Sequence, residues 1–315
     1  MNDYQADVVV IGSGPGGEGA AMQLSKGGKR VILVERYEKV GGGCTHWGTI
    51  PSKALRAAIF QLTETLNNPL FAKSGIKVKP TVADLTRTAQ RTIDKQVSMR
   101  TKFYSRNDVE ILFGQAKFEN EKTILVGEDI RVTADDVVVA VGSSPFLPED
   151  IDFDHPRIFC SNSILTLEEK PSTMVILGAG VIGCEYASMF RNLDVKINLV
   201  NSRDELLDFL DDEISDALGY HMRERGVVIR HNEVSDRIVG LDDGVITHLE
   251  SGKQLKSDIF LWAAGRTGNT GGLGLEKVGL EANRRGYLSV DECFQSVRPP
   301  TERYRISVVC HFPNG

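Results

Sequence analysis

Two glycine-rich segments of this 315-residue chain have the spacing of loops that bind the phosphates of a dinucleotide. The first contains Gly12, Gly14 and Gly17 in a Gly-x-Gly-x-x-Gly pattern. In such a loop the first glycine permits a tight turn, the second lets the backbone approach a pyrophosphate, and the third allows close helix packing. The N-terminal N–H groups and the dipole of the following helix also favour phosphate. The pattern therefore predicts a dinucleotide site.

The segments around the first pattern are those that such a site needs. Residues 6–11 are predicted to form a buried parallel strand, because only one of them is polar. A helix is expected over 18–26 and a second strand over 30–34. Glu35 ends that strand 23 residues after Gly12, where a carboxylate accepts a hydrogen bond from a ribose 2′-hydroxyl. An ordinary strand-to-helix turn would explain the glycines but not the acid.

The second half of the chain repeats this arrangement and predicts a second dinucleotide site. A strand expected over 173–177 is followed by the second set of glycines, which are Gly178, Gly180 and Gly183. A helix should begin near 184, and the next strand is expected over 195–200. Asn201 ends that strand, again 23 residues after the first glycine of its pattern.

Asn201 has the place in the repeat that Glu35 has in the first half. A carboxylate there would favour NAD and repel the 2′-phosphate of NADP, whereas asparagine removes the repulsion and can still bond a hydroxyl. Arg203, two residues later, could offer a cation to the phosphate. These residues predict a site for both NAD(H) and NADP(H). The simpler interpretation, in which Asn201 only ends a strand and Arg203 is solvated, stays open.

The segment from Gly41 to Lys53 reads GGGCTHWGTIPSK. It resembles the active-site segment of the flavoprotein disulfide reductases of class I, the family of lipoamide dehydrogenase and glutathione reductase. That family has two cysteines here, separated by four residues and followed by Ile-Pro-Ser-Lys. This chain has the first, Cys44, and carries Thr49 in place of the second.

A threonine hydroxyl cannot form a disulfide, so Thr49 removes the electron acceptor that the family normally uses. The resemblance then implies a branch that uses FAD to transfer hydride between NADPH and NAD⁺, with the nicotinamide nucleotides as small-molecule partners. A reductase similar to dihydrolipoamide dehydrogenase or mercuric reductase is the alternative, and the missing cysteine argues against it. A catalytically inactive nucleotide-binding fragment is a third possibility for this chain.

The resemblance also assigns roles to individual residues. The N-terminal site would hold FAD through a set of residues near its adenosine and pyrophosphate, namely Glu35, Arg36, Gly41, Gly42, Gly43 and Cys44. Lys53 would pair with Glu185 beside the flavin and stabilise the negative charge of the reduced ring; with Thr49 they form the predicted catalytic set. Glu185 alone could instead be an acid favoured by a helix N-terminus. Gly142 and Gly265 end two apolar strands in segments similar to further cofactor-binding signatures of the family.

The repeat predicts an α/β fold of two doubly wound dinucleotide-binding domains, with the nicotinamide domain inserted in the FAD domain. Residues 1–145 and 271–299 would form the FAD domain, and 146–270 the NAD(P) domain. Helices are expected over 52–66, capped by Ser52, and over 81–106. The other expected strands are 109–118, 123–126, 130–133 and 136–141 in the first half, and 227–231, 233–240, 244–249, 254–257 and 258–264 in the second.

The C-terminal segment, residues 300–315, departs from the family pattern. The resemblance requires an apolar strand ending in Gly-Asp after residue 299, and none is present. Glu302, Arg303 and Arg305 would interrupt any replacement strand, so we expect the FAD-domain sheet to lack a strand. The C-terminal interface domain of the family is also missing. A truncated, aberrant tail of this kind predicts poor FAD retention.

Composition excludes other classes of function. A formal net charge of −6 argues against nucleic-acid binding. No apolar run is long enough to span a bilayer, and the polar N-terminus does not resemble a signal peptide, so a cytoplasmic location is expected. The five cysteines and six histidines lack metal-ligand spacing, and no metal site is predicted. The family resemblance implies a homo-oligomer for the full-length form.

Overall fold

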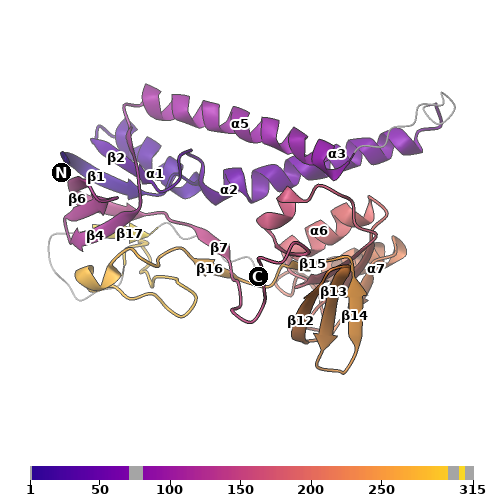
Figure 1. Cartoon of the computed structure of the whole chain (residues 1–315). Coiled ribbons are helices and arrows are strands. Elements are labelled where there is room, and N and C mark those ends of the chain that lie inside the picture. The colour runs from indigo at the N-terminus through magenta and orange to yellow at the C-terminus, as the bar shows by residue number, and fades with distance from the viewer. Residues whose placement is uncertain (1, 71–80, 297–304, 309–315) are drawn as a thin grey trace. The chain divides into compact units, whose positions relative to one another are not determined.

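The computed structural model describes residues 2–70, 81–296 and 305–308. The described residues divide into two compact units (Figure 1). The first lies within 1–46, 93–144 and 266–312, and the second within 47–92 and 145–265. Each unit contains one of the two glycine patterns.

The first unit is built on a sheet with seven strands among the described residues. In spatial order these are β3 (Glu110–Phe113), β2 (Val31–Glu35), β1 (Asn2–Ile11), β6 (Ile130–Val139), β5 (Thr123–Val126) and β4 (Ala116–Asn120), with β17 (Arg305–Val308) also paired to β6. β1 is parallel to both β2 and β6. The chain therefore winds outward in opposite directions from β1, and doubly wound sheets bind ligands at such a point.

The last four residues of β1 are buried, and they alternate between the two faces of the sheet, as their apolar sequence predicted. Val9 and Ile11 contribute to one core, whereas Val8 and Val10 contribute to another on the opposite face. α1 (Pro15–Lys26) covers the second of these cores, where Ala21 is fully buried. These two cores fix the carboxyl end of β1, from which the glycine loop begins.

Three predicted strands of the first unit have the wrong boundaries. The segment 109–118 is two strands, because Gly114 has φ +153° and separates β3, which is parallel to β2, from β4, which is antiparallel to β5. The segments 130–133 and 136–141 are instead one strand, β6. β6 stays continuous because it pairs with β1 along nearly its whole length.

The second unit contains a parallel sheet of five strands. Their order is β11 (Val228–Arg230), β10 (Lys196–Val200), β9 (Thr173–Leu177), β15 (Ile259–Trp262) and β8 (Ile158–Cys160). A separate antiparallel sheet contains β12 (Ser235–Leu241), β13 (Gly244–Leu249) and β14 (Gln254–Ser257). The predicted α/β class is confirmed; the sheet of the second unit is parallel, and the sheet of the first unit is parallel except for β4 and β5.

The central sheet of the second unit also has a core on each face. Met174 and Ile176 of β9 pack with Phe190 of α6 (Val181–Arg191) on one face. Val175 packs with Phe260 and with residues of the antiparallel sheet on the other face. α7 (Asp212–Glu224) contributes Met222 to the first core, which places the last turn of α7 beside the sheet.

The helical segments between the glycine patterns are α3 (Thr49–Asn67) and α5 (Val82–Arg106). The prediction that Ser52 caps α3 is wrong, because the helix begins three residues earlier and the Ser52 hydroxyl donates to the Thr49 carbonyl within the first turn. The short elements are α2 (Gly42–His46), η1 (Ser163–Thr166), η2 (Leu275–Val278), β7 (Ser143–Pro145) and β16 (Arg266–Gly268). In the part of the chain that the structure describes, no helix has the length and apolarity needed to cross a membrane.

The expectation that the first sheet lacks a strand after residue 299 is wrong. β17 runs parallel to β6 with Ile306 opposite Val137, and Ile306 is only 2% exposed. Its backbone is also held from the other side, because the Ser296 N–H donates to the Ile306 carbonyl at 2.9 Å. The charged residues Glu302 and Arg303, together with the rest of 297–304 and 309–315, lie outside the described residues. In this strand of four residues, Ile306 is the side chain that joins the hydrophobic core of the first unit.

Replacing Ile306 with alanine should therefore lower the free energy of unfolding by about 2–5 kcal/mol, the usual cost of emptying a core site. Ser307 is the matched control, since it is adjacent in β17 and only partly buried. Ser307→Ala should change stability by less than about 0.5 kcal/mol. Urea denaturation followed by circular dichroism measures both changes. Equal, small effects of the two substitutions would contradict the pairing of β17 with β6.

Candidate dinucleotide-binding sites

The first glycine loop is held between the carboxyl ends of β1 and β6. Gly12 has φ +103°, and a Cβ atom there would lie 2.4 Å from the Ala140 carbonyl oxygen. A Cβ atom on Gly17 would lie 1.8 Å from the Gly12 carbonyl oxygen, so no other residue fits without moving the backbone. α1 begins at Pro15 with its N-terminus at this loop. The loop thus presents backbone N–H groups at the point where the sheet order reverses.

Glu35 is buried, being 3% exposed, and organises this loop. Its Oε2 accepts hydrogen bonds from the Ser13 N–H at 3.0 Å and from the Ser13 hydroxyl. Its Oε1 accepts from the Tyr37 N–H at 3.0 Å. A carboxylate has about four acceptor positions, so three donors leave one for a ribose hydroxyl. Glu35 therefore also braces the phosphate loop, which the sequence did not indicate.

Ser13 is a site residue that the sequence analysis missed. Its hydroxyl donates to Glu35 and accepts from the Gly41 N–H at 2.8 Å, so one side chain connects three segments. The residue is fully buried. The only signal in the sequence was a small hydroxyl residue between the first two glycines of the pattern.

The run Gly41–Gly43 lies against the first glycine loop. A Cβ atom on Gly42 would come within 2.7 Å of the Gly14 Cα, so bare backbone of the two segments forms a cradle. Two buried hydroxyls of the same unit, on Thr45 and Tyr104, have no hydrogen-bond partner among the described residues. The cradle, the free acceptor position on Glu35 and the N-terminus of α1 fit the pyrophosphate and adenosine of a dinucleotide such as FAD.

Arg36 and Cys44 were also assigned to this site. The Arg36 guanidinium lies 4.7 Å from the centre of the Tyr37 ring, a cation–π contact that holds it near the end of β2. Cys44 is a free, partly exposed thiol in α2. Both roles toward FAD stay predictions.

Gly142 and its surroundings are fixed by a residue that the sequence analysis did not single out, Asn269. The Gly142 carbonyl accepts from the Asn269 N–H at 3.0 Å, and the Asn269 side chain donates to the Val141 carbonyl at 2.9 Å. Nearby, Arg266 donates to the Ser143 carbonyl at 2.6 Å, and burial lowers the pKa of this guanidinium. These bonds hold the strand ends of β7 and β16 together.

The second glycine loop has the same local geometry as the first. A Cβ atom on Gly183 would lie 1.8 Å from the Gly178 carbonyl oxygen, and α6 begins just after Gly180. The next residue, Cys184, is buried, and its thiol donates to the Ala179 carbonyl. Burial raises the pKa of Cys184 to about 12, so this thiol stays protonated and unreactive near neutral pH.

Asn201 is 6% exposed at the end of β10 and closes the loop after that strand. Its Nδ2 donates to the Glu205 carbonyl at 2.6 Å, and its Oδ1 accepts from the Arg203 N–H at 3.3 Å. The guanidinium of Arg203 forms an ion pair with Asp208. An anionic ligand at Arg203 would therefore have to compete with a carboxylate that is already bound.

Lys53 and Glu185 meet in the second unit, near the N-terminal ends of α3 and α6. The Lys53 Nζ lies 2.6 Å from the Glu185 Oε1, and the two side chains are 46% and 31% exposed. A pair so exposed contributes at most about 1 kcal/mol to stability, so its main effect is to fix the position of the ammonium group. Gly265 lies in the same unit, where its carbonyl accepts from the Phe146 N–H. The parts of Lys53, Glu185 and Thr49 in a reaction stay predictions.

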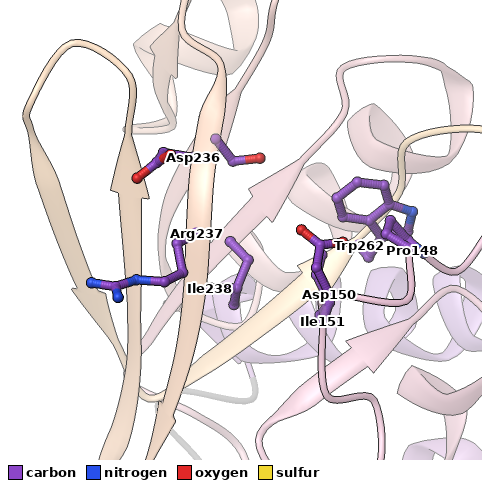
Figure 2. A pocket seen from close by; sticks show the side chains of 8 residues that line it. Pro148, Asp150, Ile151, Asp236, Arg237, Ile238 and Trp262 are labelled. Atoms are coloured by element: carbon purple, nitrogen blue, oxygen red, sulfur yellow. The ribbon is translucent and has the colours of Figure 1, made fainter.

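A small cavity of the second unit does not coincide with either glycine loop (Figure 2). It has a volume of about 140 Å³ and is lined by Pro148, Asp150, Ile151, Ser235, Asp236, Arg237, Ile238 and Trp262. Figure 2 shows the Trp262 ring beside Pro148 and Asp150, whereas the Arg237 guanidinium points away from them. Nucleotide pockets are at least about 300 Å³, so this cavity is too small for one. Within the described ranges, no group of three His, Cys, Asp or Glu side chains forms a metal site.

The fold and the two loops define a two-site dinucleotide-binding oxidoreductase, and comparison with protein families agrees. The model of the pyridine nucleotide-disulphide oxidoreductases matches residues 6–300. The chain belongs to this family, which confirms at family level the predicted resemblance and the use of FAD and pyridine nucleotides.

The names of curated relatives are more specific than the description of the family. The soluble pyridine nucleotide transhydrogenases of Escherichia coli O81 (strain ED1a) and Shigella boydii serotype 18 are each 51% identical over 317 residues. These alignments cover 99% of this chain and 68% of each relative.

Solved structures support the fold. The HOCl-induced flavoprotein disulfide reductase RclA from Escherichia coli has a TM-score of 0.81 and 27% identity, covering 96% of this chain and 65% of RclA. LpdA from Mycobacterium tuberculosis has a TM-score of 0.84 at 23% identity, covering 98% of this chain and 67% of LpdA, a likeness of fold alone. The chain thus spans about two thirds of the length of these proteins.

The hydrogen bonds of Ser13 yield a stability prediction. Ser13→Ala should lower the free energy of unfolding by about 1–3 kcal/mol, because buried Glu35 loses a donor and the Gly41 N–H loses its acceptor. Ser105→Ala, on the exposed side of α5, is the control and should have an effect below about 0.5 kcal/mol. Thermal denaturation of both variants measures these changes. If Ser13→Ala is as stable as the parent, the hydrogen bonds of the Ser13 hydroxyl do not contribute to stability.

Proposed function

We propose that this chain carries the two nucleotide sites of an FAD-dependent transhydrogenase that moves hydride from NADPH to NAD⁺. The observation that carries the proposal is a complete dinucleotide loop in each unit combined with a single cysteine in the active-site segment. Relatives that are 51% identical and are named soluble pyridine nucleotide transhydrogenases support it. The predicted domain ranges, FAD in 1–145 with 271–299 and NAD(P) in 146–270, belong to this proposal.

The first unit is proposed to hold FAD. The Gly12–Gly17 loop and the Gly41–Gly43 run would line the pyrophosphate with backbone, and Glu35 would accept from the adenosine ribose. When bound, FAD supplies the chemistry, because its ring system accepts a hydride from one nicotinamide and gives it to another. The protein supplies position and electrostatics.

Thr49 decides where the electrons go. With threonine in place of the second cysteine, Cys44 has no partner in the segment with which to form a redox disulfide. The described cysteines Cys44, Cys160, Cys184 and Cys293 are all free thiols. The segment then offers no thiol pair that could take electrons from the flavin, which argues against the activity of a dihydrolipoamide dehydrogenase or mercuric reductase.

Lys53 is proposed as an electrostatic group and Glu185 as its positioning residue. An ammonium held in place stabilises negative charge that develops on the flavin ring during hydride transfer. Glu185, 2.6 Å away, would keep the ammonium in one orientation. The second loop, with the neutral Asn201 at the end of β10, is proposed to accept either nucleotide.

The full-length protein is further proposed to be a homo-oligomer located in the cytoplasm, on the basis of the family resemblance. The competing function is a nucleotide-binding fragment without turnover, which the missing Gly-Asp segment favoured. β17 weakens that alternative, because it supplies a strand whose expected loss was a reason for poor FAD retention.

The visible spectrum of the purified chain and the rate of NADPH oxidation by an NAD⁺ analogue test the proposal. A flavin absorbance band with steady turnover is expected. A colourless protein that still binds nucleotides would instead identify the fragment without turnover. Reduction of lipoamide or of mercuric ion at a comparable rate would contradict the assignment of Thr49.

Cys44→Ser should retain hydride transfer within about threefold, because no disulfide lies on the path of the electrons. A loss above about 100-fold, or roughly 3 kcal/mol of transition-state stabilisation, would show a direct chemical role for the thiol.

Lys53→Ala should lower the rate of hydride transfer by about 10- to 100-fold, since a preorganised charge near developing negative charge is lost. Binding of NADPH, measured by fluorescence quenching, should change little. Lys102→Ala, at an exposed position of α5, is the control. A Lys53 variant with parental turnover would remove this residue from the mechanism.

A further inference from the structure

We propose that Arg223 and His231, rather than Arg203, bind the 2′-phosphate of NADP(H) at the second dinucleotide site. This inference rests on the proposed function, because it needs a site that accepts the phosphorylated nucleotide. It moves the specificity-determining cation from the loop after β10 to the last turn of α7 and the end of β11.

Arg203 is poorly available for this role. Its guanidinium is paired with Asp208, and its N–H donates to the Asn201 side chain. A phosphate approaching Arg203 would also meet the negative charge of Asp208, whose side chain is 46% exposed. The Arg203–Asp208 pair therefore disfavours the 2′-phosphate that Arg203 was predicted to bind.

His231 is placed beside Asn201 by the pairing of two parallel strands. Val200 of β10 lies opposite Arg230 of β11, so the residues just after these strands are neighbours at the carboxyl edge of the sheet. The Asn201 N–H donates to the Arg230 carbonyl at 2.8 Å, which fixes the register at this edge. His231 thus lies next to the residue that the dinucleotide fingerprint assigns to the ribose 2′ position.

The hydrogen bonds around His231 leave one ring N–H without an acceptor. Its Nε2 lies 2.9 Å from an Arg223 guanidinium nitrogen, and its Nδ1 lies 3.4 Å from the Asn201 Nδ2. Both neighbours are donors, and a neutral imidazole has one acceptor nitrogen. The shorter contact, to Arg223, is the hydrogen bond, so Nδ1 carries a proton and faces another donor. The Asn201 Nδ2 already donates to the Glu205 carbonyl, so the group left for an anionic oxygen is the His231 Nδ1–H.

Arg223 provides the positive charge. It lies in the last turn of α7, and within the ranges that the structure describes it forms no ion pair with a carboxylate. A Cβ atom on Gly219 would lie 3.2 Å from the Arg223 Nη1, so the guanidinium folds back over the bare backbone of α7. His231 holds the other side of the group. A guanidinium held in this way needs little reordering to bind a phosphate.

The acid nearest to Arg223 in the sequence has a partner of its own. Glu224 lies 3.4 Å from the His221 Nδ1. Arg225, two residues beyond Arg223, donates instead to the Asn192 side chain at 3.3 Å. Arg225 is therefore a matched control, since it is an exposed arginine adjoining the same helix but with a different partner.

Isothermal titration of the purified chain with 2′,5′-ADP and with 5′-ADP tests the assignment. Arg223→Gln should weaken 2′,5′-ADP binding by about 10- to 100-fold, the loss expected for a charge-assisted hydrogen bond, and should change 5′-ADP binding less than threefold. His231→Gln should have a smaller effect in the same direction. Arg225→Gln and Arg203→Gln should leave the preference for the 2′-phosphate intact.

Failure of the proposed function and failure of this inference would give different results. If the parent chain binds 2′,5′-ADP no better than 5′-ADP, the use of NADP(H) in the proposed function fails. If the parent prefers 2′,5′-ADP and Arg203→Gln abolishes that preference while Arg223→Gln does not, the present inference is overturned. If Arg223→Gln loses both ligands, Arg223→Lys decides: a selective loss of 2′,5′-ADP affinity supports the assignment, and parental affinity for both ligands refutes it.

Discussion

The structure depends on one steric constraint, repeated in both units, that brings a helix against the end of a strand. In each loop a carbonyl oxygen lies 1.8 Å from where the first side-chain carbon of Gly17 or Gly183 would be. Only glycine allows this approach, and only this approach aims the N-terminus of α1 or α6 at the edge of its sheet. The buried strands β1 and β9 fix the point from which each helix begins.

The two loops share their backbone geometry but differ in the side chain at the end of the neighbouring strand, β2 or β10. Glu35 is buried and braced by Ser13 and Tyr37, so its charge is part of the loop. Asn201 is neutral and uses its amide to close its own loop. One scaffold therefore carries a carboxylate at the end of one strand and a neutral amide at the end of the other, and the proposed division between FAD and nicotinamide nucleotides rests on this difference.

The active-site segment illustrates how a substitution can redirect chemistry without changing the fold. Thr49 begins α3, and this helix still carries Lys53 to Glu185. The segment thus retains a positioned ammonium while it has lost one of two thiols. Disulfide reduction at this segment would need both sulfur atoms, whereas the proposed hydride transfer between nucleotides would need neither.

The sequence by itself determined the two loops, the buried strands β1 and β9 and the α/β class, because glycine spacing and apolar runs are local properties. It also indicated the Lys53–Glu185 pair, through the resemblance. It did not determine that Gly114 divides the segment 109–118 into two strands, or that Ile306 lies in a further strand, β17. It also did not determine that Ser13 binds Glu35 or that Arg203 pairs with Asp208. Those depend on which strands pair and which side chains are neighbours in space, and residues far apart in the chain meet only once the tertiary structure has formed.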